Sequence, residues 1–199
     1  MKNFPLTTAI FEGGLVAVAI ALGWLLKSPP LVTFRFDPYA AALGIVATVP
    51  LLGLFWLCVR CPLRPFVKIT KILDEAIVPL FRECRFVELA ILATLAGLGE
   101  EMLFRGVVQT VASEQIGGLH GMWLGLVVSA LLFGLLHLIT PTYALLATLI
   151  GLYLGWLWLA CGNLLAPVVT HGVYDFVALV YLVKVRAGAR STDDDSPTP

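Results

Sequence analysis

The feature that most constrains this 199-residue chain is a series of long apolar stretches separated by short breaks. A transmembrane helix needs about 20 mostly apolar residues, and six stretches approach or exceed that length. Only 13% of the residues are charged, against about a quarter in soluble domains. The chain is therefore predicted to be an all-α, polytopic membrane helix bundle of about six transmembrane helices. The stretches cover residues 12–27, 38–59, 86–110, 121–140, 142–160 and 164–184.

Four regions follow from this pattern. Residues 1–60 are predicted to form two N-terminal transmembrane helices, and residues 86–186 a helical core. Residues 61–85 carry apolar side chains at helical spacing opposed by charged ones, which predicts an amphipathic helix on the anionic inner leaflet; a solvated cytoplasmic helix is the alternative. The acidic tail, 187–199, has nothing apolar to bury and is predicted to be disordered.

The distribution of Lys and Arg predicts the orientation. With six spans, ten basic residues lie on the side that holds the segment 60–85 and both termini, and only Lys27 and Arg35 lie on the other. Basic residues favour the cytoplasmic side, so both termini are expected in the cytoplasm, in a prokaryotic inner membrane. Glu12 interrupts the first apolar stretch, which is therefore expected to be a retained helix and not a secretory signal.

Charge and cysteine content narrow the function classes. The formal net charge of zero lacks the basic excess that nucleic-acid binding needs, so no nucleic acid is expected as a partner. Cys58 and Cys61 form a C-x-x-C without a second ligand pair; reduced, inert thiols are expected, with a metal or redox role as the alternative. Glycines repeat every four residues at 117–125 and 151–155, which predicts tight helix packing or, less favoured, a dimer interface.

Six acidic, basic or imidazole side chains of the third, fourth and sixth apolar stretches stand out, because such groups are costly inside a bilayer. A charged side chain at the bilayer centre costs about 2.5–3.5 kcal/mol. Such residues indicate a functional site at a bundle interior or a hydrated cavity. The third stretch contains Glu100, Glu101 and Arg105, the fourth contains His137, and the sixth contains His171 and Asp175.

Helical geometry separates the two adjacent acids. Glu101 and Arg105 are four residues apart and share a face, whereas Glu100 is turned by about 100° from Glu101. Arg105 is therefore predicted to neutralise Glu101 and to leave Glu100 as the unpaired acid. One buried ion network of all three residues is the alternative.

The residue types favour activation of a water molecule. A carboxylate can act as general base, a histidine can orient or share the proton, and further donors can stabilise an oxyanion. Two imidazoles and two acids are also adequate zinc ligands, yet no standard zinc-helix motif is present. These residue types therefore leave the metal open.

Three short motifs lie in order on apolar stretches of the chain. They are Glu100-Glu101-Met102-Leu103-Phe104-Arg105, Phe133-Gly134-Leu135-Leu136-His137 and His171-Gly172-Val173-Tyr174-Asp175. These motifs resemble the E-E-x-x-x-R, F-x-x-x-H and H-x-x-x-N/D motifs of the type II CAAX prenyl endopeptidase and bacteriocin-processing family of intramembrane proteases. The resemblance covers about residues 86–180 and leaves the first two helices outside.

The resemblance implies an all-helical membrane endopeptidase with its site in a cavity between helices. It implies that Glu100 activates water with His137 as its partner, and that His171 and Asp175 hold the oxyanion or a metal. A glutamate-type mechanism is preferred to a metalloprotease; no cofactor is favoured, and a divalent metal such as zinc bound by those four residues stays open. The supporting residues are expected to be Glu101, Arg105 and Phe133.

The last position of the third motif, where this sequence has Asp175, differs chemically between its two permitted residues, Asn and Asp. An Asn there could donate a hydrogen bond to an oxyanion, whereas an ionised Asp only accepts. Asp175 is therefore expected to accept the ring N–H of His171 or to ligate a metal, unless it is protonated.

The depths of these groups conflict if the helices are straight. At about 1.5 Å per residue, Glu100 lies near mid-bilayer, His137 about 10 Å toward the cytoplasm and His171 about 5 Å the other way. Either residues 111–125 form a loop or lie at the interface, so that the fourth helix is shifted, or the helices tilt. The first is preferred because Gly117 and Gly118 lie there.

The leading hypothesis is an intramembrane endopeptidase acting on a membrane-embedded or lipidated peptide or protein. The runner-up is a non-catalytic membrane immunity or assembly factor, and the third is a proton-coupled transporter. The resemblance implies prenylated C-terminal motifs, propeptides or bacteriocin leaders as substrates, and nothing in the sequence selects among them. Oligomeric state is left open.

Overall fold

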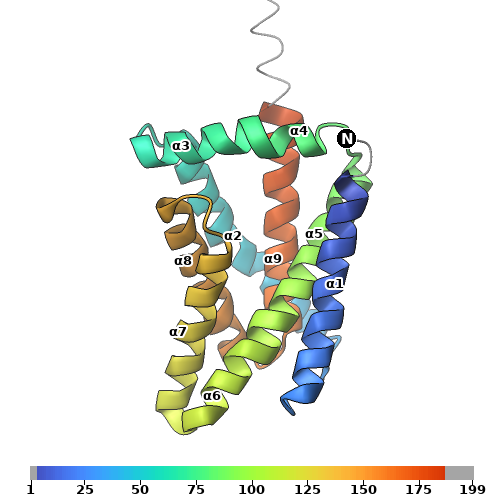
Figure 1. Ribbon diagram of the computed structural model, residues 1–199, viewed down its shortest axis with the longest axis vertical. Coiled ribbons are helices and arrows are strands. Elements are labelled where there is room, and N and C mark those ends of the chain that lie inside the picture. Colours follow the sequence, from blue (N-terminus) through green and yellow to red (C-terminus); the bar gives the residue numbers. More distant parts are fainter. Residues whose placement is uncertain (1–3, 187–199) are drawn as a thin grey trace, which may run out of the picture.

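The computed structural model describes residues 4–186, and every regular element in that range is a helix (Figure 1). This confirms the predicted all-α bundle. The predicted disordered tail, 187–199, lies outside the described residues. Five helices are long and apolar enough to cross a membrane: α1 (Phe4–Leu25), α2 (Pro38–Arg60), α7 (Gly118–Leu136), α8 (Pro141–Cys161) and α9 (Leu165–Val180) with its π-helical continuation Tyr181–Arg186.

A sixth rod is built from three helical pieces. Helix α5 (Phe86–Glu101) is only 16 residues long. It continues into a π-helical stretch, Met102–Gln109, and then into α6 (Thr110–Ile116). In Figure 1 this rod runs obliquely along the length of the bundle, beside α1.

The course of this rod corrects one prediction. Residues 111–125 do not form a loop, because α6 continues to Ile116 and α7 begins at Gly118. The turn between them is Gly117, whose φ of +71° is a backbone conformation that favours glycine. The α5–α6 rod instead runs obliquely through the bundle (Figure 1), which agrees with the other expectation, a tilted helix.

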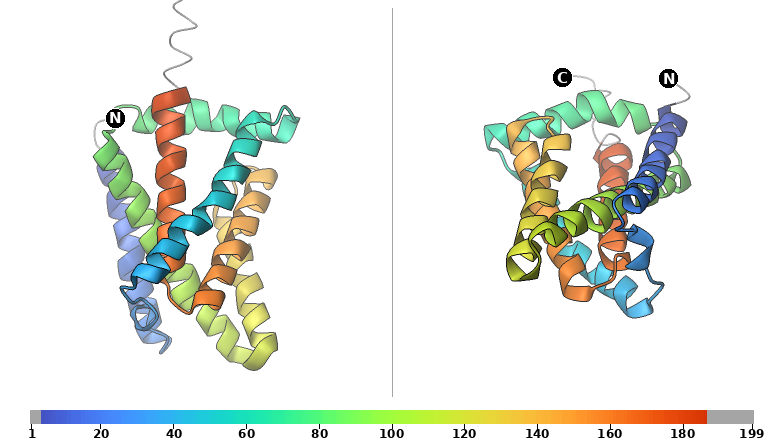
Figure 2. Two further views of the ribbon diagram at one scale, coloured as in Figure 1. Left: turned by 180° about the vertical axis from the view of Figure 1, so that it is seen from behind. Right: turned by 60° about the horizontal axis from the view of Figure 1, so that its bottom comes forward.

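A roof lies across one end of the bundle. It consists of α3 (Arg64–Ile72), a π-helical turn (Leu73–Ile77) and α4 (Val78–Phe81), and it runs across the ends of the long helices (Figure 1). The start of α1 and the end of α9 lie at this same end of the molecule (Figures 1 and 2). The roof is amphipathic as predicted, with Ile69, Val78 and Phe81 buried and Arg64, Lys68 and Lys71 exposed.

Local capping fixes the helix start that matters for the site. Pro141 occupies the first turn of α8, where its missing N–H costs nothing, and the Thr140 hydroxyl accepts a hydrogen bond from the Tyr143 N–H at 3.1 Å. The turn between α7 and α8 is therefore short and defined.

Glycines allow the helices to approach closely. Gly121 and Gly125 of α7 face Ser113 on α6, and Gly151 of α8 faces Ala130 on α7. The repeated glycines at these positions are thus used in packing within the chain, as predicted.

Gly97 on α5 is the clearest case, and it leads to a prediction. A Cβ there would lie 2.8 Å from the backbone nitrogen of Gly172 on α9 and 3.0 Å from the carbonyl oxygen of Val168. Since neither backbone atom can move aside cheaply, Gly97→Ala is expected to lower the free energy of unfolding by about 1–3 kcal/mol. The matched control is Gly53→Ala on α2, where nothing lies within 4 Å. Thermal unfolding in detergent compares the two; equal stability would contradict the close crossing.

Candidate active site

Three helices bring two histidines to one carboxylate. Glu100 comes from α5, His137 from the C-terminal end of α7, and His171 from α9. The Nε2 atoms of His137 and His171 lie 3.8 Å and 3.9 Å from the same oxygen, Oε2 of Glu100. That oxygen is buried and has no hydrogen-bond partner within residues 4–186. Because buried polar atoms are nearly always satisfied, it is the atom that a bound water or substrate group would engage.

The backbone defines which nitrogen of His137 faces the site. Its Nδ1 lies 2.8 Å from the carbonyl oxygen of Phe133, and a carbonyl can only accept. The neutral ring therefore carries its proton on Nδ1 and presents the Nε2 lone pair toward Glu100. Helix α7 ends at Leu136, so the predicted span 121–140 is too long and His137 opens the turn to α8.

Glu101 lies at the centre of a buried ion chain. Its Oε1 is 2.7 Å from Nη1 of Arg105, and both side chains are 0% exposed. The same Oε1 lies 2.8 Å from Nδ1 of His171. Arg105 also donates through Nη2 to the carbonyl oxygen of Gly151 on α8 at 2.9 Å. The predicted pair of Glu101 and Arg105 forms, and it extends to His171 through a contact that the sequence analysis did not predict.

The hydrogen bonds of His171 differ from those expected for its pairing with Asp175. Glu101, not Asp175, accepts from Nδ1 of His171 and so fixes the orientation of the ring. Asp175 Oδ2 instead lies 3.4 Å from Nε2 on the opposite side of the ring, and its side chain is 30% exposed. Nε2 of His171 is therefore flanked by two carboxylates, those of Glu100 and Asp175.

Phe133 packs between the polar groups. Its ring stacks on His137 with centroids 4.4 Å apart and meets His171 edge-on at 6.0 Å. The guanidinium carbon of Arg105 lies 4.8 Å from its centroid, a cation–π distance. Phe133 thus contacts both imidazoles and the guanidinium of Arg105, which is linked to His171 through Glu101.

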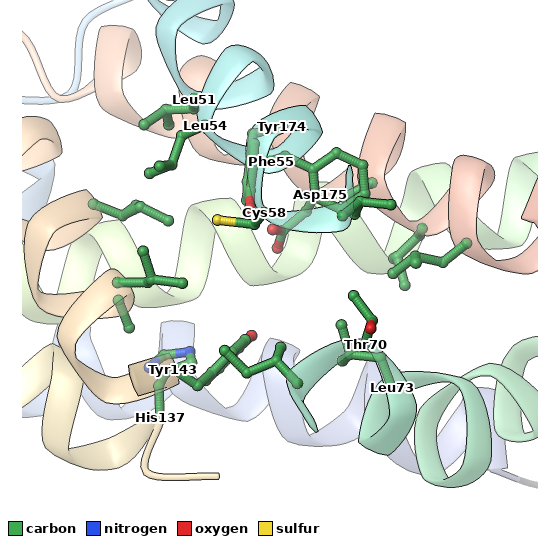
Figure 3. Close-up of a pocket in the computed structure, with 18 of the residues that line it drawn as sticks. Leu51, Leu54, Phe55, Cys58, Thr70, Leu73, His137, Tyr143, Tyr174 and Asp175 are labelled. Atoms are coloured by element: carbon green, nitrogen blue, oxygen red, sulfur yellow. The ribbon is translucent and has the colours of Figure 1, made fainter. Parts of the chain in front are cut away.

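An apolar cavity of about 250 Å³ adjoins these groups. It lies between α2, α3, α8 and α9, and most of its lining is aliphatic or aromatic (Figure 3). The polar groups at its wall include His137, His171 and Asp175, together with the phenols of Tyr143 and Tyr174. The site is therefore open on one side to a space that suits a hydrocarbon group.

Glu12 of α1 is a further acid that the sequence analysis did not assign to the site. Its carbonyl oxygen would lie 2.7 Å from a Cβ on Gly99, which places it beside the residue before Glu100. Its Oε2 is buried without a hydrogen-bond partner among the described residues. The rule that flagged the other acids, a carboxylate inside an apolar stretch, also applies to Glu12.

The donor chemistry of the site suits zinc, since imidazole nitrogen and carboxylate oxygen are zinc ligands. Within residues 4–186, however, no group of three or more His, Cys, Asp or Glu side chains is arranged to hold a metal ion. The arrangement thus does not fit a preformed metal centre, and the expectation that favours no cofactor but leaves a divalent metal open is not tested by it. Cys58 and Cys61 are free thiols.

Residues 83–177 match the family model of the type II CAAX prenyl endopeptidase Rce1-like proteins. This segment is Rce1-like. The resemblance expected from the three motifs is confirmed, and at a general level the match supports a membrane protease. The Rce1-like segment starts just before α5, ends within α9 and contains the four candidate catalytic residues. Comparisons with curated proteins and with solved structures give no match.

Proposed function

We propose that this protein is an intramembrane endopeptidase in which Glu100 and His137 activate a water molecule for attack on a peptide bond. The observation that carries the proposal is the convergence of two Nε2 atoms from two helices on one carboxylate oxygen of a third, an oxygen that has no hydrogen-bond partner within residues 4–186. The match of this segment to a protease family supports the reaction class.

The distances suit a bridging water. At 3.8 Å, His137 Nε2 and Glu100 Oε2 are too far apart for a direct hydrogen bond, but a water can bond to both at about 2.8 Å. The Nε2 lone pair of His137 accepts one water hydrogen and orients the oxygen. Glu100 takes the other proton as the water oxygen attacks the carbonyl carbon.

The second histidine has a complementary task. Glu101 holds Nδ1 of His171, so that its Nε2 faces the reacting groups. When Nε2 is protonated, the N–H can donate to the oxygen that becomes negative during attack. Collapse of the tetrahedral intermediate then breaks the C–N bond, and the proton on Glu100 passes to the leaving amine.

The cavity indicates the substrate class. An apolar space of about 250 Å³ beside the site favours a substrate that presents a hydrocarbon group next to its scissile bond. We therefore propose a membrane-embedded or lipidated peptide or protein as the substrate, taken from the bilayer.

A direct assay tests the function. The full-length protein in liposomes is incubated with three peptides: one with a farnesylated cysteine near its C-terminus, the same peptide unmodified, and one apolar transmembrane peptide. Mass spectrometry is expected to show endoproteolysis of a membrane-bound peptide and at least tenfold slower cleavage of the unmodified one. No cleavage of any peptide would favour the non-catalytic alternative. If a zinc chelator removes the activity and added zinc restores it, the reaction uses a metal-bound water, and activation of the water by Glu100 alone is contradicted.

The width of the cavity is tested by a separate prediction. Leu54 of α2 lines the cavity, whereas Leu57 on the same helix is 66% exposed. Leu54→Trp is expected to raise KM for the membrane-bound peptide about tenfold, about 1.4 kcal/mol of binding, with kcat within twofold. Leu57→Trp is the matched control and should leave KM unchanged. Equal KM values for both variants would show that the substrate does not enter this cavity.

A further inference from the structure

The proposed reaction needs a hydrogen-bond donor that the motif residues do not fully supply. Negative charge develops on the substrate oxygen during attack, and donors aimed at it are usually a large part of catalysis. An ionised Asp175 offers no donor. Arg105 is 0% exposed, with Nη1 and Nη2 engaged by Glu101 and Gly151. His171 donates from Nε2 only when it is protonated.

Tyr143 places a neutral O–H donor at the site. It is fixed in the first turn of α8 by the Thr140 cap. Its ring centroid lies 6.5 Å from that of His137, and it lines the cavity together with His171 and Asp175. Figure 3 shows its hydroxyl directed into this space. Within residues 4–186, the side-chain contact found for Tyr143 is the one with the His137 ring, and its hydroxyl has no hydrogen-bond partner there.

The other hydroxyl and thiol groups of the cavity are less well suited. The Thr70 hydroxyl already donates to the carbonyl oxygen of Val67 at 3.0 Å. The Cys58 thiol is a weak donor. Tyr174 packs edge-on against Phe55 with centroids 6.3 Å apart.

The ring contacts distinguish the two phenols. The ring of Tyr143 lies beside that of His137, with centroids 6.5 Å apart. The ring of Tyr174 packs on Phe55 of α2, and within residues 4–186 no ring contact joins it to either histidine of the site. Tyr143 is thus the phenol placed beside a histidine of the proposed site.

We propose that Tyr143 is a catalytic residue whose hydroxyl donates a hydrogen bond to the oxyanion of the tetrahedral intermediate. This assignment rests on the proposed peptidase function. As the water oxygen bonds to the carbonyl carbon, the π electrons move to the carbonyl oxygen and Glu100 holds the water proton. Tyr143 keeps its own proton throughout. When C=O re-forms and the C–N bond breaks, the amine takes the proton from Glu100.

The test is Tyr143→Phe in the liposome assay with the farnesylated peptide. The variant keeps the ring and loses only the O–H, so kcat is expected to fall about 10- to 100-fold with KM within twofold. A peptide phosphinate that mimics the tetrahedral intermediate should bind more weakly by a similar factor. The matched control is Tyr153→Phe on the same helix, whose hydroxyl donates to Ala47 at 2.9 Å outside the cavity; its kcat should equal that of the unaltered protein.

The outcomes separate this inference from the proposed function. An unaltered protein that cleaves no membrane-bound peptide overturns both. A protein that cleaves, while Tyr143→Phe retains full kcat and full phosphinate affinity, overturns only the role of Tyr143. A fall in kcat for Tyr174→Phe with none for Tyr143→Phe also overturns it and assigns the donor to α9. If Tyr143→Phe raises KM and leaves kcat unchanged, Tyr143 serves substrate binding, and the proposal is contradicted.

Discussion

Glu100→Gln is expected to lower the rate of peptide cleavage by about 10³-fold while the protein stays folded. The amide cannot take up the proton of the attacking water, and positioned general bases contribute about 10²–10⁴-fold. Oε2 of Glu100 makes no hydrogen bond within residues 4–186, and the two histidine nitrogens lie 3.8 and 3.9 Å from it. The amide has the same shape as the carboxylate, so the substitution removes the charge without breaking a direct hydrogen bond. The loss should therefore appear in kcat and not in the unfolding temperature.

The measurement is single-turnover cleavage in liposomes, with the unfolding temperature in detergent as the check on folding. Glu114→Gln provides the control, because Glu114 is exposed on α6, away from the site. A Glu100→Gln protein that still cleaves at nearly the normal rate would exclude Glu100 as the base.

Arg105→Met is expected to reduce the free energy of unfolding by about 3–5 kcal/mol. The substitution leaves Glu101 as a buried carboxylate without its cation, and removing one partner of a buried ion pair typically costs that much. It also removes the bond to the Gly151 carbonyl and loosens the contact of Glu101 that holds His171. Stability and activity should therefore fall together.

A second arginine in the same chain is the matched control. Arg85 pairs with Glu88 at 3.1 Å, but its side chain is 81% exposed, and surface pairs contribute about 0–1 kcal/mol. Arg85→Met should therefore change stability little. The double variant Glu101→Gln with Arg105→Met should recover part of the stability lost by Arg105→Met. Equal stability of Arg85→Met and Arg105→Met would contradict the buried ion chain.

The sequence was sufficient to predict the bundle and the residues that meet. Ionisable side chains are so costly in an apolar helix that Glu100, His137 and His171 could be identified by that rule alone. The four-residue spacing likewise predicted that Arg105 pairs with Glu101. The catalytic roles of these residues stay predictions, since geometry alone does not test them.

Contacts between distant segments could not be predicted in the same way. The bond of His171 to Glu101 joins residues 70 positions apart, and no local spacing encodes it. Depth estimates assumed straight helices, so the oblique course of α5 was missed. Tyr143 looked like an ordinary residue of an apolar stretch, because its position at the cavity depends on how α8 packs against α2 and α9.

The π-helical stretch Met102–Gln109 should tolerate the deletion of a residue poorly. A π-helical turn holds one residue more than the α-helical hydrogen-bond pattern accommodates, and here Arg105 and Gln109 reach the carbonyl oxygens of Gly151 and Gly155 on α8. Deleting one residue between Arg105 and Gln109 would reduce their spacing from four residues to three, whereas their two acceptors, Gly151 and Gly155, would stay four residues apart. In this stretch, a single-residue deletion should therefore be more damaging than most single substitutions.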